Sequence, residues 1–486
     1  MVQSVPKVGV VALAAGVTVL ATTVAAVTAV AAVTAAARSD VAVGPVAAAL
    51  TTSAGLAGDV RPNAIRLPGV ARVAPPTTAE CEQGQSIACY TPDQVRAAYQ
   101  LPALYARGVT GKGVTIVIED SYGSPTIASD LATFDRQFGY PAPPRLSVIM
   151  PIGKVAKFNP HNANMTGWAW ETSMDVEYAH ALAPGASILL AETPATGAGS
   201  SERQVMEVEE YVVKHRLGAV ISQSFSGTEA GFSREAQLQP LRAGILDAAS
   251  HRVTVLAASG DAGATTAAAN GPGFYTRREV NWQASDPLVT GVGGTELVES
   301  GSSYTSVAWN DTYDVAVDEN WSGTKDPSPH ATGGGRSALF ARPSYQNGVK
   351  SVTGASRGVP DIAMSAACNG AVAVYTSFLP GKVGWSEGCG TSEATPEFAA
   401  IVALADQVAG RWLGPINPTL YKLAAEHAPG LVNVTSGDNT VSFYGGKPAK
   451  RYTITGYHAR SGYSLVTGVG TINASLFVYE LAGKQA

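Results

Sequence analysis

Aromatic side chains are absent from the beginning of this sequence: of its 486 residues, none before Tyr90 is Phe, Trp or Tyr. Charge is also scarce, because charged residues make up 15% of the chain against the roughly 25% usual for soluble domains. The chain has 33 Lys and Arg residues and 38 Asp and Glu residues, which gives a net charge of -5. Because this charge offers no positive surface potential to a polyanion, we expect no nucleic-acid partner. Hydrophobic residues still reach 45%, which excludes disorder of the whole chain.

The aromatic-free stretch divides the chain. Residues 38–89 are rich in Ala, Gly, Pro and Thr, and without aromatics they can hardly build a core, so we expect a short extended or partly disordered leader. Residues 90–483 contain every aromatic side chain and show no internal linker or repeat, which predicts one large domain.

The N-terminus, residues 1–37, has the pattern of a secretory signal. Residues 8–37 carry no charge and are mostly Ala and Val, and the small residues Ala35 and Ala37 precede Arg38 as at a cleavage site. The run is also long enough to span a bilayer, so an uncleaved membrane tether through residues 8–37 is the alternative. We expect an exported monomer, either secreted or anchored at the cell surface.

Four cysteines fit an oxidising compartment. Cys81 lies near Cys89, and Cys368 lies near Cys389, so two local disulfides are the simplest pairing. Four free thiols are the alternative. Metal binding is disfavoured, because neither pair has zinc-finger spacing or a nearby His.

Apolar runs alternate with helical patterns from about Tyr90 onward. Short runs rich in Val, Ile and Leu are typical of strands buried on both faces of a sheet. The runs are Val114–Ile118, Ser187–Leu190, Ala219–Ser222, Val253–Ala257, Leu288–Val292 and Ala371–Tyr375, and the helical patterns cover 125–138, 168–182, 201–215, 234–250 and 395–409. Together they predict an α/β fold with a mainly parallel central sheet and helices on both faces, in which active groups gather at the carboxyl ends of strands.

A Gly-Thr-Ser sequence carries the first chemical signal. In EGCGTSEATPEFAAIVALADQ, Ser392 stands just before a helix that Pro396 announces in its first turn. A hydroxyl there lies at the positive end of the helix dipole, where backbone N–H groups can receive an oxyanion, which suits a serine nucleophile. The alternative is that Ser392 is only a helix cap.

Two acids could supply the base that a serine nucleophile needs. In GWAWETSMDVEYAHALAPGA, Glu171 and Asp175 lie one helical turn apart on an otherwise apolar stripe, so we expect both to point inward. Because like charges repel there, one carboxyl should hold a proton and hydrogen-bond to the other. The alternative, a solvated acid on a surface helix, fits Glu177 better.

A third acid ends the buried strand in VTVLAASGDAGA. Asp261 stands there on a tight glycine turn, at a carboxyl strand end. Asp beside Gly is common turn chemistry, so an Asx-turn is one interpretation. If its site keeps it protonated, the carboxyl could instead donate a hydrogen bond to an oxyanion.

The blocks around these residues resemble a known family. The helix start GTSEATP is shared by subtilisin-like proteases and by their acid-acting relatives, the sedolisins or serine-carboxyl peptidases. A subtilisin would carry a His in an HGTxVA-type helix where this chain has Glu171. None of the seven histidines of this chain stands in such a context. From about Tyr90 to near Ala474 the blocks look like sedolisin blocks in the family's order: WAWETSMDVEYAHALAPGA, VISQSFSGTE, ASGDAGA, QASDPLVTGVGGTEL, TGGGRS, VPDIA and GCGTSEATP. The chain is thus identified as an exported, bacterial-type member.

The resemblance implies a subtilisin-like fold and a role for each candidate residue. Ser392 would be the nucleophile and Glu171 the general base and later acid. Asp175 would orient Glu171, and Asp261 would donate to the oxyanion. The implied reaction is hydrolysis of protein or peptide substrates through an acyl-enzyme, without a required cofactor, by an endopeptidase in preference to a tripeptidyl peptidase. A carboxylate base with an unperturbed pKa of about 4.3 predicts activity that peaks in acid.

Two alternatives stay open. A non-catalytic subtilisin-like binding module at the cell surface is favoured by the lack of room for a large prodomain in residues 38–89. A neutral triad of Asp120 and a distant His is the other, and the missing His motif weakens it.

The family tends to hold a calcium ion near the C-terminus, and here that site is degenerate. Asn433 and Ser464 stand where aspartates are usual, Arg460 replaces a glycine, and Val434 and Gly462 could offer backbone carbonyls only. Loss of two negative charges weakens an oxygen cage for a divalent ion. We expect no tight calcium site.

Overall fold

The structure is a computed structural model that describes residues 59–67, 71–194, 200–269, 273–301, 303–313 and 329–485. The expected signal, residues 1–37, and the leader up to residue 58 lie outside the described residues. Across the described ranges, no helix combines the length and the apolar character needed to cross a membrane.

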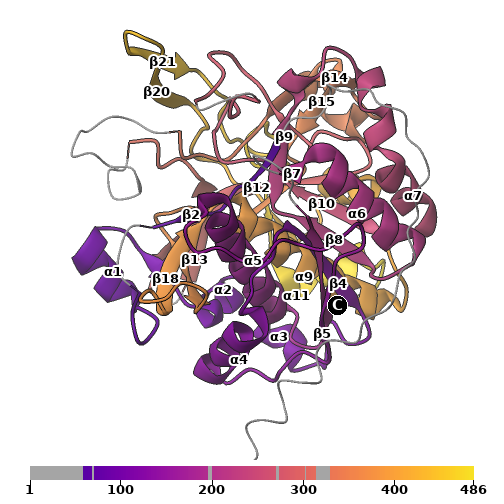
Figure 1. Cartoon of the computed structure of the whole chain (residues 1–486). Coiled ribbons are helices and arrows are strands. Elements are labelled where there is room, and N and C mark those ends of the chain that lie inside the picture. Colours follow the sequence, from indigo (N-terminus) through magenta and orange to yellow (C-terminus); the bar gives the residue numbers. More distant parts are fainter. Residues whose placement is uncertain are drawn as a thin grey trace, which may run out of the picture. The chain divides into compact units, whose positions relative to one another are not determined.

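A central sheet of eight strands organises the described part of the chain (Figure 1). Its order is β13 (Ser303–Ala308), β12 (Thr290–Ser300), β10 (Thr254–Ala258), β8 (Val220–Gln223), β4 (Thr115–Ser121), β6 (Ser187–Thr193) and β5 (Leu146–Ile149), and β16 (Ile362–Ser365) pairs with β12. The β13 strand is antiparallel to β12, and the other pairings are parallel. The predicted mainly parallel sheet is confirmed.

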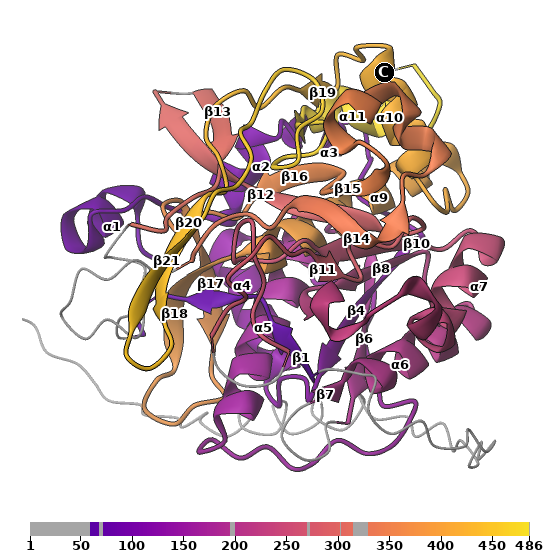
Figure 2. The ribbon, with the colours of Figure 1, turned by 90° about the horizontal axis from the view of Figure 1, so that it is seen from above.

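Helices cover both faces of this sheet, as predicted for strands without a polar face (Figure 2). On one face lie α5 (Ala163–Leu182) and α9 (Thr391–Ala409), which pack against each other. On the other face lie α6 (Glu202–Lys214) and α7 (Ala243–His251). The architecture is the predicted α/β arrangement.

Two helix boundaries differ from the prediction in places that matter for the site. Helix α5 begins at Ala163, earlier than expected, and the Asn162 side chain caps it by accepting from the Met165 N–H at 3.1 Å. Helix α9 begins at Thr391, so Ser392 lies inside its first turn and Pro396 inside the helix. The polar first turn of α9 carries no apolar periodicity, which is why the sequence pattern placed its start too late.

One predicted strand lies in a different sheet. The run at 371–375 forms β17 (Ala371–Thr376), but β17 belongs to a second sheet of order β2 (Ile65–Arg66), β18 (Gly384–Cys389), β17 and β3 (Cys89–Tyr90). It is antiparallel to β18. An apolar run predicts a buried strand but not its neighbours, so the sequence could not assign it to a sheet.

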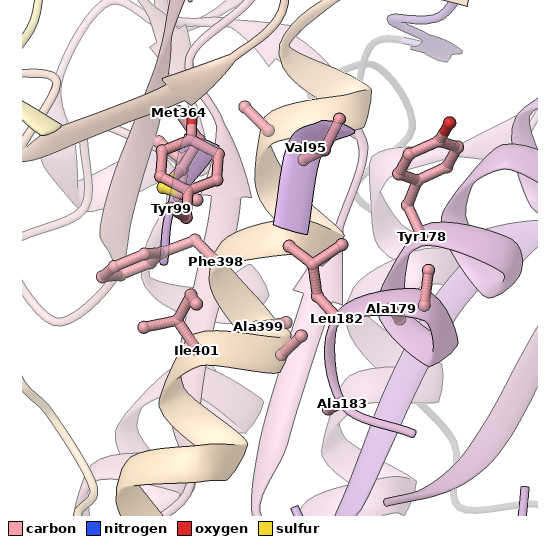
Figure 3. Packing of buried hydrophobic residues seen from close by; sticks show 14 of the residues in the cluster. Val95, Tyr99, Tyr178, Ala179, Leu182, Ala183, Met364, Phe398, Ala399 and Ile401 are labelled. Atoms are coloured by element: carbon pink, nitrogen blue, oxygen red, sulfur yellow. The ribbon is translucent and has the colours of Figure 1, made fainter. Parts of the chain in front are cut away.

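Helix α5 is buried on nearly every side, because α9, β17, β4 and α4 (Ile127–Phe138) all pack against it. Figure 3 shows part of this core, where Ala399 of α9 lies beside Leu182 of α5. The expectation that Glu177 is solvated is therefore wrong. Its carboxylate is fully buried and accepts from the Tyr375 N–H at 3.1 Å, and burial raises its pKa well above the ordinary value.

Both predicted disulfides are present, Cys81–Cys89 and Cys368–Cys389. The first joins Cys81 in α1 (Thr78–Gln85) to Cys89 in β3, and α1 is a helix in the stretch that the sequence assigned to the leader. Thr77 and Glu80 form a capping box at its start, which explains how so polar a segment becomes helical.

The remaining elements connect and flank these layers. The strands are β1 (Asp59–Pro62), β7 (Ser200–Ser201), β9 (Phe225–Thr228), β11 (Asn281–Trp282), β14 (Gly335–Ala341), β15 (Ser356–Val359), β19 (Leu431–Val432), β20 (Val441–Gly445), β21 (Lys450–Ile454) and β22 (Thr471–Ile472). The helices are α2 (Pro92–Ala98), α3 (Pro102–Tyr105), α8 (Lys350–Thr353), α10 (Asn417–Ala425) and α11 (Ala474–Leu481), with short 3-10 turns at 229–231, 235–237, 239–241 and 344–349.

Candidate active site

Three neighbouring parallel strands bring polar side chains to one edge of the central sheet. Asp120 lies at the carboxyl end of β4, Ser224 follows β8, and Asp261 follows β10. All three side chains are buried or nearly so. In a parallel sheet this edge is where ligand-binding and reactive groups collect, because the loops leaving it can converge.

The start of α9 supplies the serine at this edge. Gly390 precedes the helix with φ 121, a backbone angle that a residue with a Cβ rarely adopts. Ser392 is fully buried, and its hydroxyl donates to the Ser224 carbonyl at 3.0 Å. Pro396 has no N–H to offer the Ser392 carbonyl, and the Ser224 hydroxyl donates to that carbonyl instead, at 3.3 Å. Because of Pro396, the Ser392 carbonyl can accept this hydrogen bond, which holds Ser392 at the sheet edge.

Glu171 faces Ser392 from α5. A hydrogen bond from Ser392 favours the charged form of Glu171, and so does the Ala64 N–H, which donates to Glu171 Oε2 at 2.7 Å. Burial has the opposite and larger effect and, with the negative charge of Asp120 nearby, raises the pKa of Glu171 well above its ordinary value. Since the Ser392 hydroxyl has one hydrogen, the rotation of that hydrogen about the Cβ–Oγ bond decides whether Ser224 or Glu171 receives it.

Asp175 and Asp120 complete a group of buried acids with Glu171. Burial, then the charges of Asp120 and Glu171, raise the pKa of Asp175 well above the ordinary value. Burial also raises the pKa of Asp120 to about 7. A hydrogen bond from the Ser224 hydroxyl acts in the opposite direction on Asp175, with a smaller effect. Three like charges this close cannot all be present in a dry site, so the group must hold protons. A proton shared by Glu171 and Asp175 stays a prediction.

Asp261 lies beside the Gly390 turn. Its Oδ1 accepts from the Thr391 N–H at 2.8 Å and from the Thr391 hydroxyl at 2.6 Å, while its Oδ2 is buried without a partner among the described residues. Burial raises its pKa to about 7. A protonated Oδ2 can donate a hydrogen bond, which is the chemistry an oxyanion needs.

An N-terminal segment runs along this edge of the sheet. Strand β1 is antiparallel to both β7 and β9, and β2 is antiparallel to β18 (Figure 2). Between β1 and β2 the backbone of Asn63 and Ala64 passes the acids, and the Asn63 N–H donates to the Ser224 carbonyl at 3.2 Å. The site accepts an extended peptide backbone on both sides of Ser392.

The structure brings together all four candidates from the sequence: Ser392, Glu171, Asp175 and Asp261. The sequence analysis missed the place of Ser224 and considered Asp120 only as part of a histidine triad. A detectable signal existed for Asp120, because a charged residue ends an apolar strand at the edge where active groups gather.

The structure gives no support to the alternative of a neutral triad. His180, which lies on the same helix as Glu171, contacts the Pro141 carbonyl at 2.9 Å and Asp135 at 3.2 Å. Among the described residues, no histidine is recorded in contact with Ser392 or Asp120.

The residues at the degenerate calcium position are engaged with the protein itself. The Asn433 side-chain oxygen accepts from the Gly462 N–H at 2.7 Å, and the Ser464 hydroxyl lies 3.0 Å from the Thr467 hydroxyl and accepts from the Thr467 N–H at 3.0 Å. No cluster of three or more His, Cys, Asp or Glu able to hold a metal occurs in the described ranges. This donor set, without a carboxylate, does not fit a tightly bound calcium ion.

Comparison with known proteins gives clear relatives, although no family model matches the chain. Kumamolisin from Bacillus sp. (strain MN-32) is 32% identical over 396 residues, which cover 80% of this chain and 63% of kumamolisin. Tripeptidyl-peptidase 1 of Homo sapiens is 27% identical over 365 residues, covering 71% of this chain and 56% of that protein. The chain thus spans less than two thirds of the length of these relatives.

A solved structure supports the fold. Pseudomonas sedolisin, a serine-carboxyl proteinase complexed with two molecules of pseudo-iodotyrostatin, superimposes with a TM-score of 0.64 at 23% identity, over 81% of this chain and 97% of that one. The described fold is therefore subtilisin-like α/β. With the sequence relatives, it shows that the chain belongs to the sedolisin family.

Proposed function

We propose that the chain is an acid-acting serine-carboxyl peptidase in which Ser392 attacks the peptide carbonyl. Glu171 takes the proton of the Ser392 hydroxyl and returns it to the leaving amine. Asp175 orients the Glu171 carboxyl and limits how readily it ionises. Asp261 donates a hydrogen bond to the oxyanion. The observation that carries the proposal is the convergence of a buried serine at a helix start with Glu171 and Asp261 from two other elements.

The pH range of activity follows from the protonation states that Glu171 and Asp261 need. Glu171 must have lost a proton to act as a base, which sets the acid limb of the pH profile. Asp261 must keep its proton to donate, and its pKa of about 7 sets the other limb. A bell-shaped profile that falls as the pH rises through about 7 is therefore expected.

We further propose that the peptidase cuts within chains. The continuous backbone from Asp59 to Leu67 lies along the site, with Asp59 to Asn63 on one side of the acids and Ala64 to Leu67 on the other. A tripeptidyl peptidase must instead stop its substrate three residues before the cut bond. The open course of this segment favours an endopeptidase, while the relatives include tripeptidyl-peptidases.

The two disulfides fit an oxidising compartment, so we propose that the enzyme is exported and meets protein or peptide substrates outside the cell, as a monomer and without a required cofactor.

The test is hydrolysis of an unfolded protein between pH 3 and pH 8. Ser392→Ala and Glu171→Gln should each lower kcat/KM by at least about 10⁴-fold. Ser436→Ala and Glu82→Gln, at exposed positions, are matched controls and should keep full activity. Cleavage of a peptide with a blocked amino group would separate endopeptidase from tripeptidyl action. A folded chain that cuts nothing and forms no adduct with a peptide aldehyde would favour the binding module.

A further inference from the structure

Two helices end in an arginine at a position where glycine is usual. Helix α6 closes with the Leu217 N–H donating to the Val212 carbonyl at 3.1 Å, and Arg216 in that turn has φ 52. Helix α7 ends in the same way at Arg252, whose φ is 59. Such helix ends favour glycine, because a residue with a Cβ is strained at positive φ. Arginine at both places therefore points to a role for its side chain.

One cavity joins these two arginines to the end of α9. Its volume is about 280 Å³, and its lining residues are Arg216, His251, Arg252, Arg411 and Trp412. Arg411 and Trp412 come directly after the last turn of α9. The loop that follows them packs against the end of α7, because a Cβ added to Gly414 would lie 2.9 Å from the Arg252 Cα. Three helix ends thus meet around one cavity, and each brings an arginine to it.

The three guanidinium groups keep most of their hydrogen-bond donors unused. Among the described residues, the structure records no ion pair for any of the three arginines. The Arg216 guanidinium lies over the Trp412 ring, 5.3 Å from the ring centroid, and Trp412 packs against the hydrophobic core. The Arg411 guanidinium donates to the Trp412 carbonyl at 3.3 Å, which uses one of its five N–H groups. The other donors remain available to a molecule in the cavity.

Stabilisation of the helix ends does not account for these arginines. A cation near a helix C-terminus is favourable, above all when it donates to the last carbonyls. Histidines hold that place in both helices: His215 Nδ1 lies 2.8 Å from the Tyr211 carbonyl oxygen, and His251 Nδ1 lies 2.8 Å from the Asp247 carbonyl oxygen. The arginine that follows each histidine has no recorded side-chain hydrogen bond to a carbonyl of its helix within the described ranges.

A buried acid near the cavity does not neutralise the arginines in acid. Burial raises the pKa of Asp406 to about 7, against smaller opposite effects of the Leu413 N–H and of the Arg411 charge. Below that pH Asp406 holds a proton and carries no charge. Three positive charges around one cavity repel each other, and an anion between them removes that repulsion.

We infer that Arg216, Arg252 and Arg411 bind a small oxyanion with two or more negative charges, either a free phosphate or sulfate species or such a group on a larger molecule. The N–H groups of a guanidinium fit the oxygens of these anions two at a time. The cavity is at the lower end of the roughly 300–1,000 Å³ of ligand pockets, which favours a small ligand. The net charge of -5 disfavours a long polyanion. The inference goes beyond the proposed function and does not depend on it.

This anion site lies at the edge of the sheet opposite to the candidate active site. Arg216 and Arg252 precede the parallel strands β8 and β10, whose carboxyl ends lead to the active site. Helix α9 begins beside Ser392 and ends before Arg411, and its 19 residues span about 28 Å. An anion at this distance does not compete with a peptide at Ser392. Because it joins the ends of three helices, it should stabilise the folded chain.

The experiment is calorimetric titration of the full chain at pH 5.5 and constant ionic strength, with Ser392→Ala as the parent to prevent self-digestion. The probes are pyrophosphate, sulfate and glucose 6-phosphate. One equivalent of anion should bind to the parent. Arg216→Gly, Arg252→Gly and Arg411→Gln should each raise its Kd at least about tenfold, because each removes charged hydrogen bonds.

The matched control is Arg451→Gln. The Arg451 guanidinium lies over the Tyr313 ring at 5.9 Å, as Arg216 lies over Trp412, but Arg451 belongs to β21 and does not line the cavity. This variant should bind the anion as tightly as the parent does.

The two glycine variants also separate binding from folding. Since glycine suits the backbone at both positions, neither Arg216→Gly nor Arg252→Gly should lower Tm when no anion is present. Pyrophosphate should raise the Tm of the parent in a saturable way and should raise the Tm of these variants less at the same concentration.

The probes also identify the source of the anion. Tighter binding of pyrophosphate or sulfate than of glucose 6-phosphate supports a free anion, and the reverse order supports an ester group on a larger molecule. A folded parent that binds none of the three at millimolar concentration overturns the anion site. Binding that the three arginine variants keep at full strength, or that sodium chloride at equal ionic strength reproduces, overturns it as well.

Discussion

Neutral pH should destabilise this protein through Asp261, and a single substitution should remove that effect. Burial raises the pKa of Asp261 from 3.8 in the unfolded chain to about 7 in the folded one. Between these values only the folded state holds the proton, so the free energy of unfolding falls as the pH rises from about 4 to about 7. At 1.36 kcal/mol for each pH unit, the loss is about 4 kcal/mol.

Asp261→Asn is the matching perturbation because an amide has the shape of the protonated acid. Its oxygen can keep both hydrogen bonds from Thr391, and its nitrogen takes the place of Oδ2, which has no partner among the described residues. The variant should equal the parent at pH 4 and exceed it by about 4 kcal/mol at pH 7.5. An unfolding entropy of about 2.1 cal/mol/K per residue makes this a difference of about 4 °C in Tm.

The assay is thermal unfolding at pH 4 and pH 7.5 in a Ser392→Ala background, which prevents self-digestion. Glu82→Gln is the control, since Glu82 is exposed and lies away from the site, so that its substitution tests the removal of one surface charge. If Asp261→Asn loses as much stability as its parent between the two pH values, Asp261 is not protonated in the folded state. The assigned oxyanion donor would then be refuted as well.

Three further predictions address the rest of the site. Asp120→Asn should leave the acid limb of the pH profile of kcat/KM in place, because Asp120, with a pKa of about 7, already holds a proton in that range; a limb that moves to lower pH would show that Asp120 is charged there. Gly390→Ala should lower kcat/KM on an added peptide by about 100-fold, since its Cβ would meet Asp261 Oδ2 at 2.6 Å; normal activity would place the reacting carbonyl elsewhere. Chelation with EDTA should change Tm by less than about 1 °C, because Asn433 and Ser464 bind the protein instead of calcium; a clear drop in Tm would show a bound metal.

The sequence predicted the fold well where the signal was local. Apolar runs located β4, β6, β8, β10 and β12 of the central sheet, because residues buried on both faces leave no polar alternation, while β5, β13 and β16 were missed. The sheet that holds β17 and β18 could not be predicted, since strand pairing depends on distant segments. Likewise Glu177 looked like a surface acid because its only visible context was its own helix, while the burial comes from the packing of β17 and other elements.

The same distinction applies to the site. Ser392, Glu171, Asp175 and Asp261 stand in recognisable blocks, so each could be named before their convergence was known. The contribution of Ala64 could not be predicted, because a backbone N–H has no sequence signature and its acceptor lies 107 residues away. The aromatic-free composition predicted an extended or partly disordered leader, whereas β1 and β2 pair with strands of the domain, because main-chain pairing requires no particular side chains.

Burial of the acids at the proposed active site would explain both the proposed chemistry and its expected pH range. The low dielectric that keeps Asp261 protonated, and so able to donate, also raises the pKa of Asp120, Glu171 and Asp175. Each raised pKa makes the folded state bind protons that the unfolded chain releases, so each favours the fold in acid and opposes it near neutrality. A histidine triad would gain nothing from this burial, because desolvation lowers the pKa of His. In the proposed enzyme, a carboxyl-based site and a fold that is favoured in acid would therefore be two results of one physical cause.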